Sequence, residues 1–445
     1  MIDRTVRWDQ RTPATEVRGE VPSRSSRSRT GWPEQALIFS TIVILPVQNH
    51  FPSVAGMSVG FLIFAAIAGY VIVNSPGILG KVWHHPCFIA AYAFIGVSIL
   101  LEFASPLSRY DEVVRFAQMI GGAVCLAVLC RDRTALIAGL YGYIAAALWV
   151  SAYLYLTSYG VIQEMGEATS FHQASKVRAE AFADKSLQAN VNALAFVCSQ
   201  GAIVAFALAL VGRMKHRRIL LLGIATFCLV AAFLPMSRGA AVISLVSFGA
   251  ILYAQGISHG KTLIFAFVLG LGLYIFVPEA VWSRMAFSSE SRDGKMEGRA
   301  WIYTTALNRL PEYVVAGVGA GNYYSKWGFE KGFGKEHDGF LTVYGAHNSL
   351  LQITIFWGLF GLLMYLWIIW CVYRSIPLRC GRDELSLALV GIMVSLSLWL
   401  MMSHGFSDKS FACGLGMLVG ARQWIWPTGI VSAVEVGRMP ATSPI

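Results

Sequence analysis

The sequence contains little charge. Aspartate, glutamate, lysine and arginine make up 13% of its 445 residues, whereas hydrophobic residues make up 56% and the mean hydropathy is +0.58. Soluble globular chains carry about 25% charged residues, so this chain has too little polar surface to fold in water. The composition argues against a soluble enzyme, a disordered regulator and a nucleic-acid-binding protein, despite a net charge of +10. It predicts a protein of the lipid bilayer.

The sequence also lacks the cysteine spacing of a disulfide-bonded or zinc-bound scaffold. None of its eight cysteines forms a C-x-x-C pair, which argues against both. A cleavable secretory signal is missing as well, because residues 1–33 hold seven arginines and three prolines in place of an apolar core. We therefore expect this segment to be a disordered basic tail.

Hydrophobic runs fill most of the remaining chain. Because a spanning helix needs about 20 mostly apolar residues, we predict an all-α polytopic membrane protein with about twelve transmembrane helices. They are expected near residues 34–50, 54–74, 86–103, 112–130, 134–158, 188–212, 217–234, 239–256, 261–279, 347–373, 384–404 and 409–427. The chain then divides into a tail at 1–33, helices one to nine within 34–279 with a periplasmic link at 159–187, a large helix-containing periplasmic loop at 280–346, helices ten to twelve within 347–427, and a tail at 428–445.

Lysine and arginine predict the orientation of these helices. Five short links on the side of the N-terminus carry eleven basic residues, whereas four short links on the opposite side carry three, Arg109, Arg238 and Lys409. Basic residues mark the cytoplasmic side, so both termini are expected in the cytoplasm and both long links outside. The short cytoplasmic links leave no room for a cytosolic domain. We expect the chemistry at the outer face or through the membrane.

Charged residues near the membrane are costly, and their positions are therefore informative. Arg238 lies between two apolar helices with no acidic residue nearby, and it either snorkels to lipid headgroups or faces an anionic substrate group. Arg115 and Gln118 share a helix face, where an ion pair of Arg115 with Asp111 or Glu112 explains the arginine as well as ligand contact does. The long link at 159–187, which includes Arg178, is too mixed in sequence for roles to be assigned.

The loop at 280–346 contains recognisable segments. Apolar residues at helical spacing over 297–310 predict an amphipathic helix on the membrane surface, with Arg299 near its start. The glycine-rich segment 317–321 lacks the parallel-strand unit of a dinucleotide site, and a tight turn that brings backbone amides near an anion is favoured. Aromatic residues between 323 and 333 suit an interfacial belt or, less well, stacking on sugars.

Two histidines lie at predicted outer ends of helices. His347 stands where the large loop meets the tenth helix, and an imidazole there can act as a general base because its ordinary pKa is near neutrality. A packed histidine hydrogen-bonded to a carbonyl is an equal alternative. His404, near the outer end of the eleventh helix, is a weaker candidate of the same kind.

Taken in order, these segments resemble the O-antigen ligase and polymerase family of bacterial inner-membrane glycosyltransferases. The resemblance rests on Ser237-Arg238-Gly239, on Gly298-Arg299-x-Trp301 followed by the glycines at 317–321, and on His347-Asn348 opening a helix that continues through Gln352 to Gly361. It covers roughly residues 190–425. The N-terminal third matches only as a set of membrane helices.

The resemblance implies transfer of a glycan from undecaprenyl pyrophosphate to a sugar hydroxyl, which belongs to lipid A–core oligosaccharide in the ligases and to another carrier-linked glycan in the polymerases. It assigns Arg238 and Arg299 to the pyrophosphate, which guanidinium groups bind well. It assigns His347 as general base of a one-step displacement that inverts the anomeric centre. No metal or other cofactor is expected, and the first outer loop, residues 49–53, has no carboxylate to hold one.

Other functions remain open at this point. Twelve helices with cytoplasmic termini also suit a glycolipid flippase or a solute transporter, but transporters concentrate polar residues near the membrane midplane, and this chain gathers them in one outer loop. The motifs do not separate ligase from polymerase. The single large loop late in the chain favours the ligase, and attachment of glycans to protein is a related alternative.

Overall fold

A computed structural model describes most of the hydrophobic part of the chain. The residues it describes are 30–47, 58–160, 162, 191–212, 214–257, 260, 270–275, 277–279, 281–282, 299–337, 340–375, 383–403, 406 and 408–424. Both tails beyond these limits, most of the link at 159–187 and most of the ninth predicted span at 261–279 lie outside the described residues. The division of the whole chain into tails, spans and loops therefore stays a prediction.

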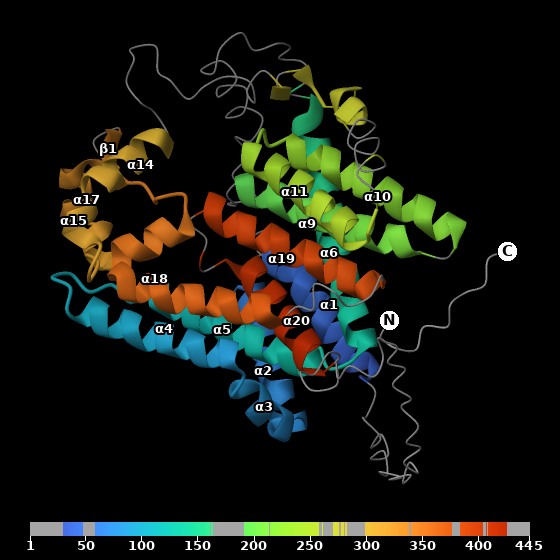
Figure 1. Cartoon of the computed structure of the whole chain (residues 1–445), viewed down its shortest axis with the longest axis horizontal. Coiled ribbons are helices and arrows are strands. Elements are labelled where there is room, and N and C mark those ends of the chain that lie inside the picture. The colour runs from blue at the N-terminus through green and yellow to red at the C-terminus, as the bar shows by residue number, and fades with distance from the viewer. Residues whose placement is uncertain are drawn as a thin grey trace, which may run out of the picture.

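The described residues form an all-α membrane protein (Figure 1). Its longer helices are α1 (Trp32–Val47), α2 (Val59–Asn74), α3 (Pro76–Trp83), α4 (Pro86–Phe103), α5 (Asp111–Leu129), α6 (Arg133–Leu154), α9 (Val191–Val211), α10 (Lys215–Phe233), α11 (Arg238–Ala254), α18 (Ser349–Ser375), α19 (Glu384–Met402) and α20 (Lys409–Trp424). Every predicted span except the ninth coincides with one of these helices. Because α1 begins at Trp32, the first helix starts just inside the predicted tail.

Seven of the described helices are long and apolar enough to cross a membrane, namely α4, α5, α6 with its π-helical extension to Tyr159, α9, α10, α18 and α19. The pair α2 and α3 would add an eighth, although it is bent by 108° at the break between the two helices. The helices α1 and α11 are apolar but shorter. The structure therefore confirms a polytopic helical protein, and the number twelve stays a prediction.

The helices pack in two groups that share α19 and α20. In one group α9 packs against α6, α10, α11 and α19. Of the residues in the most apolar stretch of α9, 89% are buried. A Cβ added at Gly201 would lie 2.0 Å from the Cβ of Ala147, so glycine is what lets α9 approach α6 this closely. In the other group α18 lies along α4, and α20 lies along α5 (Figure 1).

Contacts between the links fall into two sets. At one end of the bundle Arg131 forms an ion pair with Glu34, and Glu384 forms ion pairs with Arg133 at 3.6 Å and with Arg217 at 3.5 Å. At the other end the segment 102–109 contacts the glycine-rich segment 317–321, and Ser349 Oγ donates to the Ser403 carbonyl at 2.9 Å. The first set joins links predicted to be cytoplasmic, and the second joins links predicted to lie outside.

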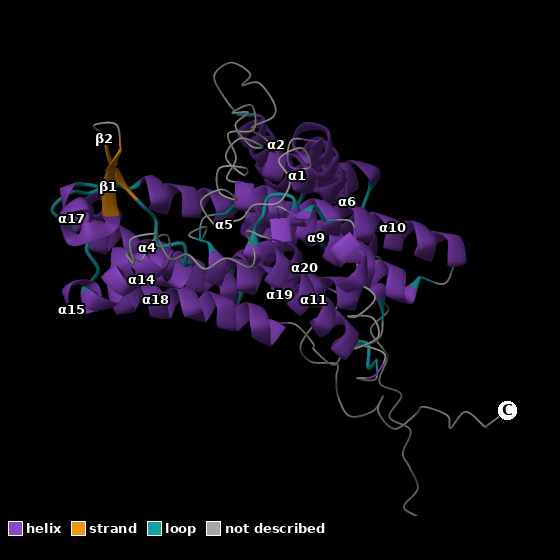
Figure 2. Ribbon diagram, turned by 90° about the horizontal axis from the view of Figure 1, so that it is seen from above, coloured by secondary structure: helices purple, strands orange, loops and turns teal. Residues whose placement is uncertain are grey.

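The large loop forms a small helical cap at one end of α4 and α18. It contains α14 (Arg299–Asn308), α15 (Leu310–Tyr313), α16 (Ala320–Tyr323), α17 (Lys326–Gly328), a π-helical turn at Phe329–Phe333, and the antiparallel strands β1 (Gly334–His337) and β2 (Phe340–Val343). Figure 2 shows the hairpin and the short helices gathered at this end. The predicted helix at 297–310 is confirmed over 299–308.

The cap is joined to α18 through a break in that helix. At Trp357 and Gly358 the backbone leaves the helical conformation, and the N–H groups of Val318 and Gly319 donate to the Ile355 and Phe356 carbonyls, each at 2.8 Å. Gly317 and Gly358 both have positive φ, and a Cβ at either would lie 2.2 Å from a carbonyl oxygen of the other segment. Only glycine fits such a backbone-to-backbone contact.

Candidate functional site

The Ser237-Arg238-Gly239 turn opens α11 at the end of the bundle that carries the cap. Ser237 is the N-cap residue, and its side chain accepts from the Ala240 N–H at 3.5 Å. Arg238 is the first helical residue and its side chain is exposed. The preceding Met236 is buried with φ at +54°, a left-handed conformation that is unfavourable for a methionine.

The His347-Asn348 turn opens α18 in a related way. The side chain of Asn348 accepts from the Leu351 N–H at 3.0 Å, and the buried side chain of Gln352 reaches back to accept from the Ala346 N–H at 2.5 Å. These reciprocal bonds satisfy backbone donors at the start of the helix. They also hold His347, which lies between them, at φ +52°.

Met236 and His347 are the two residues other than glycine with positive φ in the described part of the chain. Such backbone strain costs about 1–3 kcal/mol and is found most often at functional sites. Both strained residues lie in segments that the sequence singled out for their chemistry. The local conformation therefore supports a functional role for both turns.

The two turns border the same short segment, the C-terminal end of α19. Ser349 bonds to the Ser403 carbonyl, and Gly239 lies against Met402, whose Sδ would be 3.4 Å from a Cβ on the glycine. Arg238 and His347 thus belong to turns that contact neighbouring residues of one helix end.

The third predicted residue, Arg299, begins α14, and the structure describes only its backbone. Tyr303, one turn later on the same helix, donates from its hydroxyl to the His347 carbonyl at 3.4 Å, and Trp301 contacts the ring of Tyr344. Tyr303 and Trp301 therefore place the first turns of α14 beside the segment 344–347. His404, the weaker histidine candidate, and Arg178, to which the sequence assigned no role, lie outside the described residues.

A buried carboxylate that the sequence did not reveal holds the cap in place. Glu102 is fully buried near the end of α4, and it accepts from the backbone N–H groups of Arg109 at 2.8 Å, Ala320 at 2.8 Å and Gly321 at 3.0 Å. The predicted turn that brings amides near an anion is therefore present, and the anion is a side chain of the protein itself. The acidic residue at the end of an apolar helix was the only signal for it in the sequence.

Glu102 is connected to the candidate site through backbone contacts. It fixes Ala320 and Gly321, Ser105 Oγ donates to the Val318 carbonyl at 3.0 Å, and residues 318–319 bond to the break in α18. The N-terminal segment of α18, residues 349–356 between His347 and this break, is thus tied to α4. Glu102 positions the helix that carries His347 without contacting the histidine.

Ion pairs on the cap add to this framework. Glu312 of α15 bonds to Lys331 at 2.8 Å and to Arg309 at 3.1 Å. The hydrogen bond from Lys331 holds the pKa of the Glu312 carboxyl below its usual value; desolvation opposes this shift, and Arg309 lowers the pKa further. Since these groups are partly exposed, each pair contributes about 1 kcal/mol or less.

The aromatic segment of the cap differs from expectation. Tyr323 and Phe333 are fully buried and contact each other, and Tyr323 also packs against Phe356 of α18. Buried rings can neither stack on a sugar nor form an interfacial belt. These two residues form the core of the cap, so both earlier interpretations are wrong for them.

The ion pairing expected for Arg115 is present. Its guanidinium lies 3.2 Å from Glu112, and Arg109 lies 2.9 Å from Asp111. No group of three His, Cys, Asp or Glu side chains that could hold a metal occurs within the described ranges. Independence of metal nevertheless stays a prediction, which a chelator tests.

Comparison with known proteins adds one match. Residues 223–366 match a family model described as O-antigen ligase. This region contains the Arg238 turn, α14, the cap and the His347 turn, and the match confirms the resemblance found in the motifs. No curated protein matches the chain.

Proposed function

We propose that this chain, which belongs to the O-antigen ligase family over residues 223–366, transfers a glycan from undecaprenyl pyrophosphate to lipid A–core oligosaccharide. Members of this family are glycosyltransferase-like enzymes that act on lipid-linked glycans. The observation that carries the proposal is that the Arg238 and His347 turns, both inside the matched region, contact neighbouring residues at the end of α19.

In the proposed reaction His347 removes the proton from the acceptor hydroxyl, whose oxygen attacks the anomeric carbon of the donor. The bond from that carbon to the pyrophosphate oxygen breaks, and its electron pair leaves with the undecaprenyl pyrophosphate, so the anomeric centre is inverted. Arg238 and Arg299 bind the pyrophosphate and stabilise the negative charge that grows on it. The step needs no metal, because guanidinium groups supply the positive charge.

We place this site on the periplasmic face of the inner membrane, with both termini in the cytoplasm. The asymmetry of lysine and arginine supports this placement. The contacts between links support it as well, because predicted cytoplasmic links meet at one end of the bundle and predicted outer links at the other.

A polymerase of the same family would use the same residues with a second carrier-linked glycan as acceptor. The nature of the acceptor separates the two activities. Purified protein should therefore be supplied with undecaprenyl-pyrophosphate glycan and either lipid A–core or more carrier-linked glycan. Transfer to lipid A–core alone supports the ligase, transfer to carrier-linked glycan supports the polymerase, and no transfer to either contradicts the proposal.

In this assay His347→Ala should lower transfer by about 10²–10⁴-fold, the usual contribution of a general base, because the imidazole that takes the proton is gone. The matched control is His216→Ala, which removes a histidine at the start of α10, at the opposite end of the bundle. EDTA should leave the wild-type rate unchanged. Normal turnover of His347→Ala would contradict its role as the base.

Arg238→Lys should be severely impaired, because an ammonium group cannot make the paired contacts of a guanidinium. Arg218→Lys, which alters the first turn of α10 at the opposite end, is the control. Wild-type transfer by Arg238→Lys would instead favour an arginine that only snorkels to headgroups.

A further inference from the structure

The His347 turn needs support from groups outside it. It belongs to the segment 344–348, which joins β2 to α18, and the positive φ of His347 is a strained conformation for a residue other than glycine. Such strain persists only where the surrounding structure holds it. The contacts of this segment therefore show which groups keep His347 in place.

Two tyrosines of the cap donate hydrogen bonds to this segment. The hydroxyl of Tyr323, on α16, donates to the Tyr344 carbonyl at 2.6 Å. The hydroxyl of Tyr303, on α14, donates to the His347 carbonyl at 3.4 Å. The Tyr344 N–H also donates to the Phe333 carbonyl at 3.0 Å. The cap thus contacts the backbone at both ends of the short stretch from Tyr344 to His347.

The helical bundle holds the same segment at other residues. Gln352 of α18 is buried and accepts from the N–H of Ala346, which is also buried. Ser349 joins the start of α18 to the Ser403 carbonyl at the end of α19. These bonds act at residues 346 and 349, whereas the tyrosine hydroxyls act at 344 and 347. The cap and the bundle therefore hold the turn together.

The fold depends more on the tyrosine rings than on their hydroxyls. The Tyr323 ring is fully buried against Phe333 and Phe356. Burial raises the pKa of Tyr323 above its ordinary value, so its hydroxyl keeps the proton and remains a donor. The bond from Tyr303 is longer than the distance of about 2.5–3.0 Å that is usual between two oxygens, and a bond of this length contributes little to stability. Phenylalanine at either position keeps the ring and removes only the donor.

We propose that the hydroxyls of Tyr303 and Tyr323 are positioning groups of the transfer reaction, which hold the His347 turn and thereby keep its imidazole in place for the acceptor hydroxyl. This inference rests on the proposed function, because it takes His347 as the base. Both tyrosines act through the turn, and neither is assigned a contact with the substrate.

The main test removes each hydroxyl and measures steady-state transfer. Tyr303→Phe and Tyr323→Phe should each lower kcat by about tenfold, because a small displacement of a catalytic group slows a reaction strongly. KM for the donor should stay at the wild-type value, since the hydroxyls act on the reaction and not on binding. The thermal midpoint of Tyr303→Phe in detergent should remain that of the wild type.

A matched control removes the same group from the cap without touching the turn. Tyr313 is also buried, and its hydroxyl donates at 2.8 Å to the carbonyl of Ala306 on α14. Tyr313→Phe should keep the wild-type kcat, although the bond that it loses is shorter than that of Tyr303. An equal loss of kcat in all three variants would show that transfer follows the stability of the cap, and it would overturn the inference.

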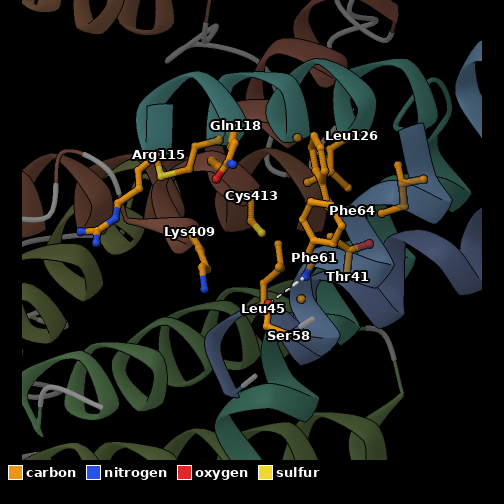
Figure 3. Close-up of a pocket in the computed structure, with 15 residues that line it drawn as sticks. Thr41, Leu45, Ser58, Phe61, Phe64, Arg115, Gln118, Leu126, Lys409 and Cys413 are labelled. Atoms are coloured by element: carbon orange, nitrogen blue, oxygen red, sulfur yellow. Dashed lines mark hydrogen bonds between the residues drawn. The ribbon is translucent and has the colours of Figure 1, made fainter. Parts of the chain in front are cut away.

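A second control lies at a cavity of about 330 Å³ between α1, α2, α5 and α20 (Figure 3). The described residues that line it include Arg115 and Lys409 but neither tyrosine nor the His347 turn. On its wall the Thr41 hydroxyl donates to the Leu37 carbonyl at 2.6 Å within α1. Thr41→Val removes a hydroxyl that donates to a carbonyl away from the turn, and it should keep the wild-type kcat. A loss as large as in the tyrosine variants would count against the inference.

The His347→Asn background separates positioning from a general structural role. Asparagine tolerates positive φ, so the turn should remain without its imidazole. If the hydroxyls act through the imidazole, Tyr303→Phe and Tyr323→Phe should lower the residual transfer of His347→Asn no further. Hydroxyls that served only the structure of the cap would lower transfer by the same factor in both backgrounds, and this result would overturn the inference.

A measurement without turnover tests the turn itself. Hydrogen exchange of the backbone amides at 344–351, followed by mass spectrometry on the full-length protein, should be faster in Tyr303→Phe and Tyr323→Phe and unchanged in Tyr313→Phe. Unchanged exchange in the first two variants, or wild-type kcat in both, would overturn the inference and leave the proposed function intact. If the wild type transfers no glycan to either acceptor, the proposed function is contradicted, and faster exchange still supports the two tyrosines as the groups that hold the turn.

Discussion

The two ends of the helical bundle begin their helices in different ways. At the predicted cytoplasmic end α6 and α19 start after Asp132 and Asp383, whose side chains accept from the backbone N–H three residues later at 2.8 Å in an unstrained extended conformation. At the opposite end α11 and α18 start after turns that hold Met236 and His347 at positive φ. Both ends have side-chain caps, since Ser237 and Asn348 cap α11 and α18, but only the second end adds backbone strain just before its caps.

Charge is also handled differently at the two ends. Near the predicted cytoplasmic end the buried carboxylate of Glu34 pairs with Arg131, whereas at the predicted outer end the buried carboxylate of Glu102 accepts from three backbone amides. Backbone amides fix the position of a loop without using an arginine. The comparison indicates that the first end serves stability and that the second end positions chemical groups.

Among the variants that test this difference between the two ends, His347→Asn should have the largest effect on transfer. Asparagine tolerates positive φ, so the turn should remain and the thermal midpoint in detergent should change little. Transfer should fall by about 10²–10⁴-fold, the usual contribution of a general base. If the variant loses both its folded structure and transfer, the histidine is needed for the turn and not as a base. His216→Asn is the control for loss of a histidine elsewhere.

Glu102→Ala should have the next largest effect, and it should act on both stability and transfer. Three backbone N–H groups lose their acceptor, at about 1–3 kcal/mol for each one that stays buried without a partner, so we expect at least about 3 kcal/mol of destabilisation. Transfer falls because the cap no longer holds α18. The control is Glu312→Ala on the exposed side of the cap, and equal thermal midpoints for the two variants would contradict the role assigned to Glu102.

A smaller effect is expected at the other end. Asp383→Ala removes the cap of α19 and should lower stability by about 1 kcal/mol, with transfer by the folded protein unchanged. The thermal midpoint and the transfer rate are measured on the same preparation. A large loss of transfer would show that this end also affects the reaction, contrary to the difference proposed between the two ends.

The helices could be predicted from the sequence because membrane spans depend on local composition. Pro86–Phe103 was predicted to the residue, since the apolar run begins after His84 and His85 and ends before Ser105 and Pro106. The pairing of Arg115 with Glu112 was also predictable, because both lie on one turn of a helix. Such features need only neighbouring residues.

Long-range contacts were not predictable in this way. The partners of Glu102 on the cap are more than 200 residues away, and the break in α18 depends on Gly317 in a different segment. The burial of Tyr323 against Phe356 was missed, because the neighbouring sequence of an aromatic residue is the same whether the ring lies at the membrane interface or in the core of the cap. Lys409 joined Arg115 at one cavity only through the packing of α20 on α5.

The most direct test of the central claim measures single-turnover transfer for Arg238→Lys, Arg299→Lys and the double variant. If both arginines bind one pyrophosphate, their effects are coupled, and the double variant should lose less than the product of the two single losses. Arg309→Lys, directly after the end of α14, should combine with Arg238→Lys without coupling. Independent, multiplying losses for Arg238 and Arg299, or wild-type transfer by either single variant, would contradict a shared site at the outer end of the bundle.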